Sequence, residues 1–240
     1  MVQAPSRRDR IRVATTAEIK QTARRILVQR GLEAASLRAI AREMGMTAPA
    51  LYRYFCSHDD LLRHILADIF TELTADLELA IEAAAAGQVA DRLVAACRQF
   101  RRWSLDHRAE FGLLFGSPLP SLKGIMDDEF VGACAMKFGG IFWALFVEMW
   151  QYQPVPVPAD ADVDPGLRGQ LERYRDGVGI GGDLPAGAML LFLRCWVRLY
   201  GAVCLEVFGH LQFALDDPAP MFEITLTELA GMLCLSYPPG

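Results

Sequence analysis

Three helix starts around a single glycine lie within one short stretch of the chain, SLRAIAREMGMTAPALYRYFCSH. Ser36 can cap a first helix, because its hydroxyl can accept a hydrogen bond from a backbone N–H of the first turn. Gly45 stands where a left-handed residue ends that helix. Thr47 is placed to cap a second helix, with Pro49 in its first turn, and Ser57 can cap a third. This spacing predicts a compact helical unit of the helix-turn-helix type.

A longer helix is predicted directly before this motif. Thr15 and Glu18 have the spacing of a capping box, and Gly31 stands at the end of the pattern. Between them, one helical face carries an apolar stripe made of Ile19, Ala23, Ile26 and Leu27. This stripe would cover the apolar face of the helix that begins at Ser36, which gives a three-helix domain with its own small core.

Charge is distributed unevenly along the chain. Residues 1–55 hold 11 Lys and Arg against 4 Asp and Glu, whereas residues 56–240 hold 13 against 25, within an overall net charge of −5. A basic segment in an acidic chain indicates a part that faces nucleic acid. Four arginines are expected to form a flexible arm that reaches phosphates or a minor groove: Arg7, Arg8, Arg10 and Arg12.

From about residue 12 to residue 66 the chain resembles the TetR family of transcriptional regulators. The residues that carry the resemblance are Ala34-Ala35-Ser36-Leu37-Arg38, Ile40-Ala41, Gly45-Met46-Thr47, Pro49, Leu51-Tyr52-Arg53-Tyr54-Phe55 and Ser57-His58-Asp59-Asp60-Leu61-Leu62. The rest of the chain is similar to the family in length and helical character. One further feature is similar to a subset of the family, namely Trp196-Val197-Arg198-Leu199-Tyr200-Gly201 with Glu206, Gly209 and His210.

The resemblance implies a recognition helix from about Thr47 to Tyr54. Residues implied to contact DNA lie in the arm, in both helices of the motif and at the next helix start: Arg10, Arg12, Ser36, Leu37, Arg38, Thr47, Ala48, Pro49, Ala50, Tyr52, Arg53, Tyr54 and His58. The alanine methyl groups can meet thymine methyls, whereas Leu51 and Phe55 are implied to be core residues.

One position departs from the family pattern. The family often has lysine where this chain has His58, and histidine is mostly neutral at pH 7, which weakens the implied phosphate contact. The backbone N–H groups of that helix start can still bind the phosphate. Because Arg53 is the only long polar side chain of the recognition helix, part of the specificity is expected to come from DNA shape.

We expect an all-α chain with two domains. Residues 1–56 would form the basic arm and the helix-turn-helix domain, and residues 57–240 a larger helical domain for effector binding and dimerisation. A long helix is predicted over 57–86, followed by helices near 89–106, 109–115, 123–151, 165–175, 186–211 and 219–236. Prolines and aspartates predict an exposed loop over 153–164, and glycines a flexible break over 177–183.

Large apolar side chains are concentrated in the second domain. Eight aromatic residues are candidates for lining an effector cavity: Phe100, Trp103, Phe115, Phe130, Phe142, Phe146, Phe192 and Trp196. Plain core packing is the alternative for each of them. Their density favours a small apolar or aromatic effector.

The two C-terminal helices carry a broad apolar band. Its members are Met189, Phe192, Leu193, Trp196, Leu199, Tyr200, Val203 and Val207, with Phe222, Leu226, Leu229 and Leu233 on the second helix. In the TetR family such helices build a four-helix dimer interface, and a band this wide needs a partner surface. We therefore expect a homodimer, with burial inside the chain as the alternative.

The predicted function is a homodimeric transcriptional regulator that binds a palindromic operator in double-stranded DNA. Repression is the family default, with release by the small apolar effector. Activation stays open. The alternative function is that of a helical small-molecule-binding or adaptor protein whose helix-turn-helix does not bind DNA.

Other classes of protein find no support in the sequence. The six cysteines are scattered singly, without the spacing of a metal or redox site, and are expected to be buried thiols. No nucleophile motif or phosphate loop indicates an enzyme, and no metal or other cofactor is expected. The longest uncharged runs, of about 12 residues, are too short to span a bilayer. The N-terminus lacks an apolar signal segment, so a cytoplasmic location is expected.

Overall fold

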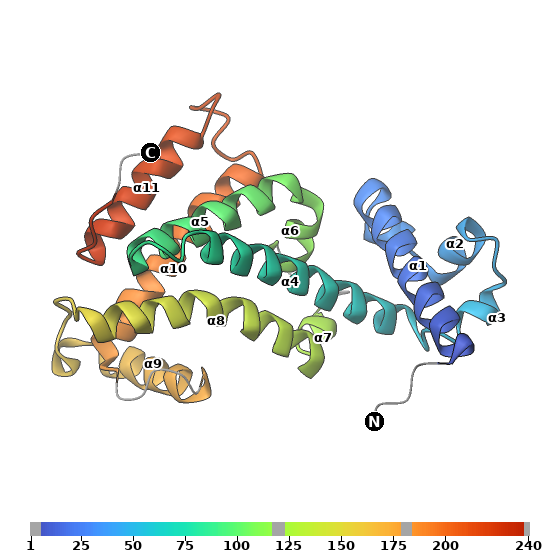
Figure 1. The fold of residues 1–240 in the computed structure, drawn as a ribbon, viewed down its shortest axis with the longest axis horizontal. Coiled ribbons are helices and arrows are strands. Elements are labelled where there is room, and N and C mark those ends of the chain that lie inside the picture. Colours follow the sequence, from blue (N-terminus) through green and yellow to red (C-terminus); the bar gives the residue numbers. More distant parts are fainter. Residues whose placement is uncertain (1–5, 117–122, 179–183, 238–240) are drawn as a thin grey trace. The chain divides into compact units, whose positions relative to one another are not determined.

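The computed structural model describes residues 6–116, 123–178 and 184–237, and over these ranges every regular element is helical (Figure 1). The expected all-α class is confirmed. The chain divides into two compact units. The first, the reading unit, comprises Met1–Phe70 and Ala109–Cys134, and the second, the body, comprises Thr71–Arg108 and Ala135–Gly240. The expected boundary between residues 56 and 57 falls inside the first unit.

The reading unit is built around three helices and the start of a fourth. These are α1 (Arg7–Arg30), α2 (Leu37–Glu43), α3 (Ala48–Leu51) and α4 (His58–Ala83), with the short helix η1 (Leu32–Ala34) after α1. Their core consists of Ile19, Ala23, Ile26, Leu27, Ile40, Leu51 and Phe55, all nearly inaccessible to solvent. Three later helices belong wholly or partly to this unit: α6 (Arg108–Phe115), α7 (Lys123–Met126) and the start of α8 (Glu129–Tyr152). The first helix is tied to α6 because Arg24 donates to the buried carboxylate of Glu110 at 3.2 Å.

Helix α1 begins earlier than the sequence predicted. Ser6, not Thr15, is its N-cap, since the Ser6 hydroxyl accepts from the backbone N–H of Asp9 and the Asp9 carboxylate accepts from the N–H of Ser6, each at 3.2 Å. This capping box satisfies two backbone N–H groups that would otherwise lack partners. The expectation of a flexible basic arm was wrong, because the arginines from Arg7 to Arg12 belong to the first turns of a helix.

The body contains the second part of α4 and the helices that form its core. These are α5 (Val89–Asp106), most of α8, α9 (Pro165–Val178), α10 (Ala186–Val207) and α11 (Ala219–Met232). Helices α5, α10 and α11 pack on one another, and α9 packs on α10. A partly buried ion pair joins α5 to α10, where Arg101 Nε lies 2.7 Å from the Glu206 carboxylate.

The segment between α8 and α9 is less exposed than predicted. Val155 and Val163 are buried in the core of the body, where they belong to the cluster of Trp143 and Phe146. The Asp160 side chain accepts a hydrogen bond from the backbone N–H of Ala186 at 2.8 Å, and a short helix, η2 (Asp160–Asp162), forms at this point. The prolines exclude an α-helix but do not prevent two valines from packing inward. Most of the break predicted over 177–183 lies outside the described residues.

Helices α8 and α10 are long and apolar enough to cross a membrane by length and composition alone. Core helices of soluble proteins meet the same criteria, and both helices contribute large side chains to the core of the body, including Trp143, Phe146, Leu199 and Val203. Charged residues also occur within both helices, at Lys137 and Glu148 in α8 and at Arg194, Arg198 and Glu206 in α10. Each helix thus has a role in the packing of the chain itself.

Candidate nucleic-acid interface and apolar cavity

The helix-turn-helix has the caps and the turn that the sequence predicted at its first helix. The Ser36 hydroxyl accepts from the backbone N–H of Ala39 at 3.3 Å. Gly45 has a φ of 65°, the left-handed conformation that favours glycine, and the N–H of Met46 returns to the carbonyl of Ala41 at 2.8 Å. This hydrogen bond closes α2 and turns the chain toward α3.

The second helix of the motif is shorter than predicted. Helix α3 ends at Leu51, and the chain continues to Phe55 in tighter turns, with the N–H of Tyr54 bonded to the carbonyl of Leu51 at 2.9 Å. Thr47 stands at the N-cap with extended backbone, but its side chain makes no capping hydrogen bond. The Thr47 hydroxyl is exposed and available to a ligand.

The side chains of this region separate into a buried and an accessible set. Leu51 and Phe55 are buried, in agreement with their implied core role. Leu37 is also buried, at 4% exposure, because the first apolar residue of α2 packs into the core, so its side chain cannot reach DNA. The other implied contact residues keep accessible surface: Arg10, Arg12, Ser36, Arg38, Thr47, Ala48, Pro49, Ala50, Tyr52, Arg53, Tyr54 and His58.

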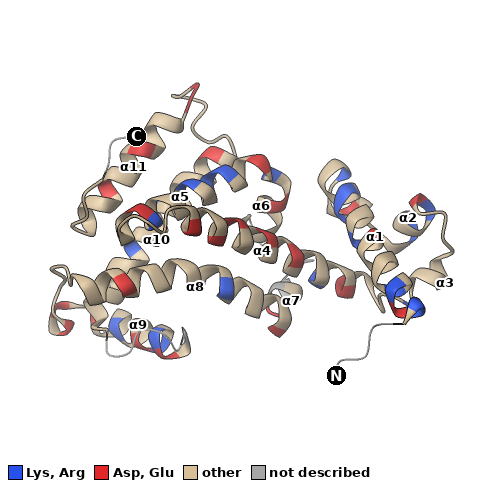
Figure 2. Cartoon of the chain, viewed as in Figure 1, with Lys and Arg blue, Asp and Glu red and all other residues tan. Residues whose placement is uncertain are grey.

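A basic groove lies between the first turns of α1 and the end of the recognition segment. It is lined by Arg7, Arg8, Asp9, Ile11, Arg12, Arg53 and Tyr54. Figure 2 shows the concentration of basic residues on the first turns of α1. None of these four arginines has an ion pair or side-chain hydrogen bond within the described part of the chain. Free guanidinium groups beside a partly exposed tyrosine are suited to binding the phosphates of a nucleic acid.

His58 has a structural partner at the start of α4. Its Nε2 lies 3.0 Å from the carbonyl oxygen of Ala35, which ties α4 to the chain just before α2. At the same helix start, Ser57 Oγ accepts from the N–H of Asp60 at 3.0 Å, and Asp60 accepts from the N–H of Cys56 at 2.9 Å. These contacts use the His58 ring and backbone N–H groups at the helix start, where the sequence predicted that a phosphate would bind.

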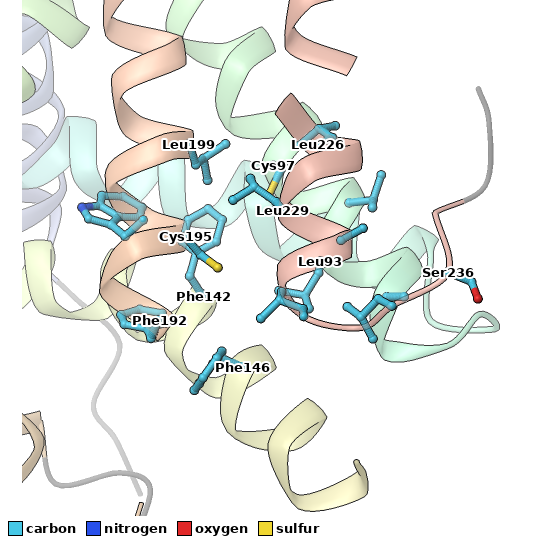
Figure 3. Close-up of a pocket in the computed structure, with 16 residues that line it drawn as sticks. Leu93, Cys97, Phe142, Phe146, Phe192, Cys195, Leu199, Leu226, Leu229 and Ser236 are labelled. Atoms are coloured by element: carbon cyan, nitrogen blue, oxygen red, sulfur yellow. The ribbon is translucent and has the colours of Figure 1, made fainter. Parts of the chain in front are cut away.

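An apolar cavity of about 70 Å³ lies within the body (Figure 3). Side chains from α5, α8, α10 and α11 converge on it, and the chain after α11 completes its wall. The lining residues are Ala90, Leu93, Val94, Cys97, Phe142, Phe146, Phe192, Cys195, Trp196, Leu199, Leu226, Leu229, Ala230, Leu233, Leu235 and Ser236. No charged side chain is among them, so an ionised ligand would find no counter-charge there.

Four of the eight aromatic candidates line this cavity, namely Phe142, Phe146, Phe192 and Trp196. Phe100 is fully buried among the rings of Phe138, Phe142 and Trp196, and Trp103 is buried against His107. The other two candidates belong to the reading unit, where Phe115 contacts Phe70 and the half-exposed Phe130 contacts His64. The structure therefore does not bring the eight together.

Sequence reasoning assigned the apolar stripe of α11 to a dimer interface, and this was wrong. Its four members, Phe222, Leu226, Leu229 and Leu233, are buried within the chain, and three of them line the cavity. The helix has a second, exposed face that the stripe did not indicate. On α10, likewise, Met189, Leu199, Val203 and Val207 are buried.

Cys97 and Cys195 are among the cavity residues that the sequence analysis did not predict. Burial raises the pKa of the Cys97 thiol to about 12, with a smaller contribution from Cys195. Burial also raises the pKa of Cys195 to about 11, although Arg198 and Arg194 oppose this shift. Both thiols are therefore neutral at physiological pH. The expectation of six buried thiols was wrong, because Cys56 and Cys234 are exposed and the other four cysteines are partly exposed.

Comparison with known proteins gives a consistent result. The family model described as bacterial regulatory proteins, tetR family, matches residues 19–65, and the one described as the tetracyclin repressor-like C-terminal domain matches residues 93–229. The HTH-type transcriptional regulator Rv1816 of Mycobacterium tuberculosis is 31% identical over 220 residues, which cover 90% of this chain and 91% of that protein.

Two solved structures extend the likeness to the fold. The regulatory protein SCO4313 gives a TM-score of 0.72 at 28% identity and covers 94% of this chain and 100% of its own. A regulator of the TetR/AcrR family from Thermobifida fusca shares the fold, with a TM-score of 0.52 at 19% identity over 94% of this chain and 100% of its own. The chain therefore belongs to the TetR family, whose members are transcriptional regulators and not enzymes, with an N-terminal DNA-binding domain and a C-terminal ligand-binding domain.

Proposed function

We propose that this protein is a homodimeric repressor that leaves a palindromic operator when an uncharged, apolar molecule binds in the body. The observation that carries the DNA-binding part is the basic groove, whose four arginines, one of them in the recognition segment, have no partner among the described residues. The repressor assignment rests on family membership, since the matching C-terminal model is described as tetracyclin repressor-like. A cytoplasmic location without a membrane partner belongs to the same proposal.

In this proposal, phosphate contacts position the protein and the short helix α3 reads bases. Thr47, Pro49 and Tyr52 are exposed on the recognition segment, while Ala48 and Ala50 are partly accessible and present methyl groups. Few polar groups are available for direct hydrogen bonds to bases. Specificity would come from methyl contacts, from the tyrosine hydroxyl and from sequence-dependent DNA shape.

Dimerisation would use the exposed faces of α10 and α11. Large apolar residues are exposed along α10 and at its C-cap, namely Leu193, Val197, Leu205 and Phe208, and on α11, namely Met221 and Ile224. Gly201 and Gly231 face open space, so a partner helix can approach both backbones closely. An apolar surface of this kind on two long helices fits a second copy, and a symmetric dimer would place two recognition segments about 34–36 Å apart.

The effector would be uncharged and largely apolar, because the cavity offers aromatic rings, aliphatic side chains and thiols. The volume of about 70 Å³ is small, since pockets for drug-sized ligands hold roughly 300–1,000 Å³. Binding would therefore enlarge the cavity. A ligand that prefers the enlarged state lowers the affinity for DNA to the extent that this state binds DNA less well.

A fluorescence anisotropy titration with duplexes from the DNA next to the gene tests the DNA-binding part. Arg53→Ala is compared with wild type and with Arg173→Ala, which removes an exposed arginine of α9 in the body. We expect tight, salt-dependent binding by wild type and by Arg173→Ala. Arg53→Ala should bind about tenfold more weakly, and its dependence on salt should fall by about one unit of slope.

The proposed repressor function would be ruled out if the wild-type protein bound no duplex from the DNA next to the gene and enriched no palindrome from a random DNA library. Equal losses of DNA affinity in Arg53→Ala and Arg173→Ala would instead place the DNA contact outside the basic groove.

A further inference from the structure

The chain reverses direction directly after α11. Cys234 has a φ of 51° and is the only non-glycine residue with positive φ among those that the structure describes. The N–H of Leu235 bonds to the carbonyl of Ala230 at 2.9 Å, and the N–H of Cys234 to that of Gly231 at 3.2 Å. A left-handed conformation at cysteine costs about 1–2 kcal/mol, so the turn persists only because contacts further along the chain hold it.

Those contacts belong to residues 235–237. Leu235 and Ser236 line the cavity, and Leu235 packs against the core of the body. Tyr237 then reaches a cluster formed with Arg98 of α5 and Glu223 of α11. Arg98 Nη2 donates to the Tyr237 hydroxyl at 2.9 Å, and the hydroxyl donates to the Glu223 carboxylate.

Arg98 and Glu223 are also bonded to each other, with N–O distances of 3.1 and 2.7 Å. The bond to Arg98 lowers the pKa of Glu223, and burial raises the pKa of Tyr237. The cluster is therefore a carboxylate, a guanidinium and a neutral phenol over the whole physiological range of pH. The guanidinium carbon also lies 5.8 Å from the centre of the Tyr237 ring.

The cavity is too small for an effector, so part of its wall must move. All its lining residues lie in helices except Leu233, Leu235 and Ser236. Moving a helix of the body disrupts many packed side chains, whereas moving the segment after α11 requires only the release of Leu233 and Leu235 from the core, of the hydrogen bonds of the turn and of the Tyr237 hydroxyl. We propose that residues 233–237 form a strap that closes the apolar cavity, latched by Tyr237, and that the strap opens to admit the ligand.

The proposal rests on the proposed function only in calling that ligand the effector. Cys97 and Cys195 report strap opening without any ligand or DNA. With pKa values of about 12 and 11 they are protonated in the closed state at pH 8, and as residues that line the cavity they are only partly exposed. Opening admits water, which brings each pKa back toward the ordinary value of a thiol, and it admits a thiol reagent.

The experiment measures the alkylation rate of each cysteine in the full-length protein at pH 8, with N-ethylmaleimide as probe and peptide mass spectrometry as readout. Tyr237→Phe removes only the latching hydroxyl. We expect alkylation of Cys97 and Cys195 to accelerate about threefold to tenfold, the loss of roughly one hydrogen bond. Cys56 and Cys134 should react at unchanged rates.

Two further variants define the outcome. Tyr152→Phe makes the same change at a tyrosine of α8 that is 86% exposed, and it should leave every rate as in wild type. A chain that ends after Cys234 lacks most of the strap and should give a larger acceleration at Cys97 and Cys195 than Tyr237→Phe.

Unchanged alkylation rates at Cys97 and Cys195 in both strap variants would contradict the proposed strap. It is equally overturned by acceleration of all cysteines alike, because that result means general loosening of the fold. Neither result bears on DNA binding, so the titration with Arg53→Ala tests the proposed repressor separately.

Discussion

The arginines of the basic groove in the reading unit and the arginines of α5 in the body are used in opposite ways. At the start of α1 and in the recognition segment, arginines are free of partners in the described chain, namely Arg7, Arg8, Arg12 and Arg53. In the body, three arginines of α5 are engaged with carboxylates, in the pairs Arg92–Glu148, Arg98–Glu223 and Arg101–Glu206. Free arginines attract an external anion, and paired ones fix helices to each other. A tally of charge along the sequence does not distinguish the two uses.

The apolar residues differ in the same manner. The reading unit buries its apolar stripe in a three-helix core with fully covered members such as Ile19, Ile40 and Leu51. The body keeps an internal cavity and also exposes an apolar face on α10 and α11. In the proposed function, the reading unit therefore acts through surface charge, and the body acts through apolar surfaces that the single chain leaves unfilled.

The largest expected effect concerns the exposed apolar face of α10. Val197→Glu places a carboxylate at a residue that is 60% exposed in the single chain and that the dimer would bury beside its own copy. We expect sedimentation analysis to show a monomer at micromolar concentration. Affinity for the operator should fall by about 100-fold or more, because two linked half-site contacts become independent.

Leu79→Glu is the matched control for the dimer, since Leu79 is 63% exposed on α4 and lies outside the α10 and α11 faces. It should remain dimeric. A Val197→Glu protein that stays dimeric would move the dimer interface to another surface.

The paired arginines of the body supply the second comparison. The Glu206 side chain is 7% exposed, whereas Glu148 is 50% exposed. Arg101→Leu leaves a buried carboxylate without its partner and should lower the free energy of unfolding by about 3 kcal/mol. Arg92→Leu breaks a pair whose carboxylate is half exposed to solvent and should cost about 1 kcal/mol or less. Urea unfolding at pH 7 measures the free energy of unfolding of both variants. Equal losses of this free energy would contradict the distinction between the two ion pairs.

The unfilled cavity predicts a smaller effect on ligand binding. Ala230→Leu adds a larger side chain at a lining residue of α11. An uncharged dye, N-phenyl-1-naphthylamine, should bind about tenfold more weakly to this variant, because the added side chain takes up space that the dye needs, and overpacking costs about 1–3 kcal/mol. Ala144→Leu, at an exposed position of α8, should bind the dye as wild type does. If the two variants bound the dye equally, its site would lie outside the cavity.

The smallest effect compares the turns that end helices in the two units. Gly45 adopts a positive φ after α2, whereas Cys234 does so after α11. Cys234→Gly should raise the free energy of unfolding by about 1 kcal/mol, since glycine reaches the left-handed region without a clash. Cys56→Gly changes a cysteine whose φ is not positive and should give no gain. A loss of stability in Cys234→Gly would mean that the cysteine side chain itself supports the turn.

Local chemistry made most of the fold predictable. The predicted starts of α5, α9, α10 and α11, at residues 89, 165, 186 and 219, agree with those observed. The cap at Ser36 and the glycine turn at Gly45 formed as predicted, because each depends on residues only a few positions away. The start of α1 was missed because two capping-box patterns, at Ser6 and Thr15, compete in one helix, and the earlier one satisfies the helix end.

The sequence by itself determined the helices, the helix-turn-helix and the excess of basic charge near its start, since these follow from periodicity, caps and composition within short segments. Only the tertiary structure decided which face of each helix is covered. In the tertiary structure the leucines of the α11 stripe line the cavity, and Leu37 is buried in the core of the reading unit. Arg98 and Tyr237 both bind the carboxylate of Glu223. Burial and pairing depend on residues far apart in the chain, so no local pattern contains them.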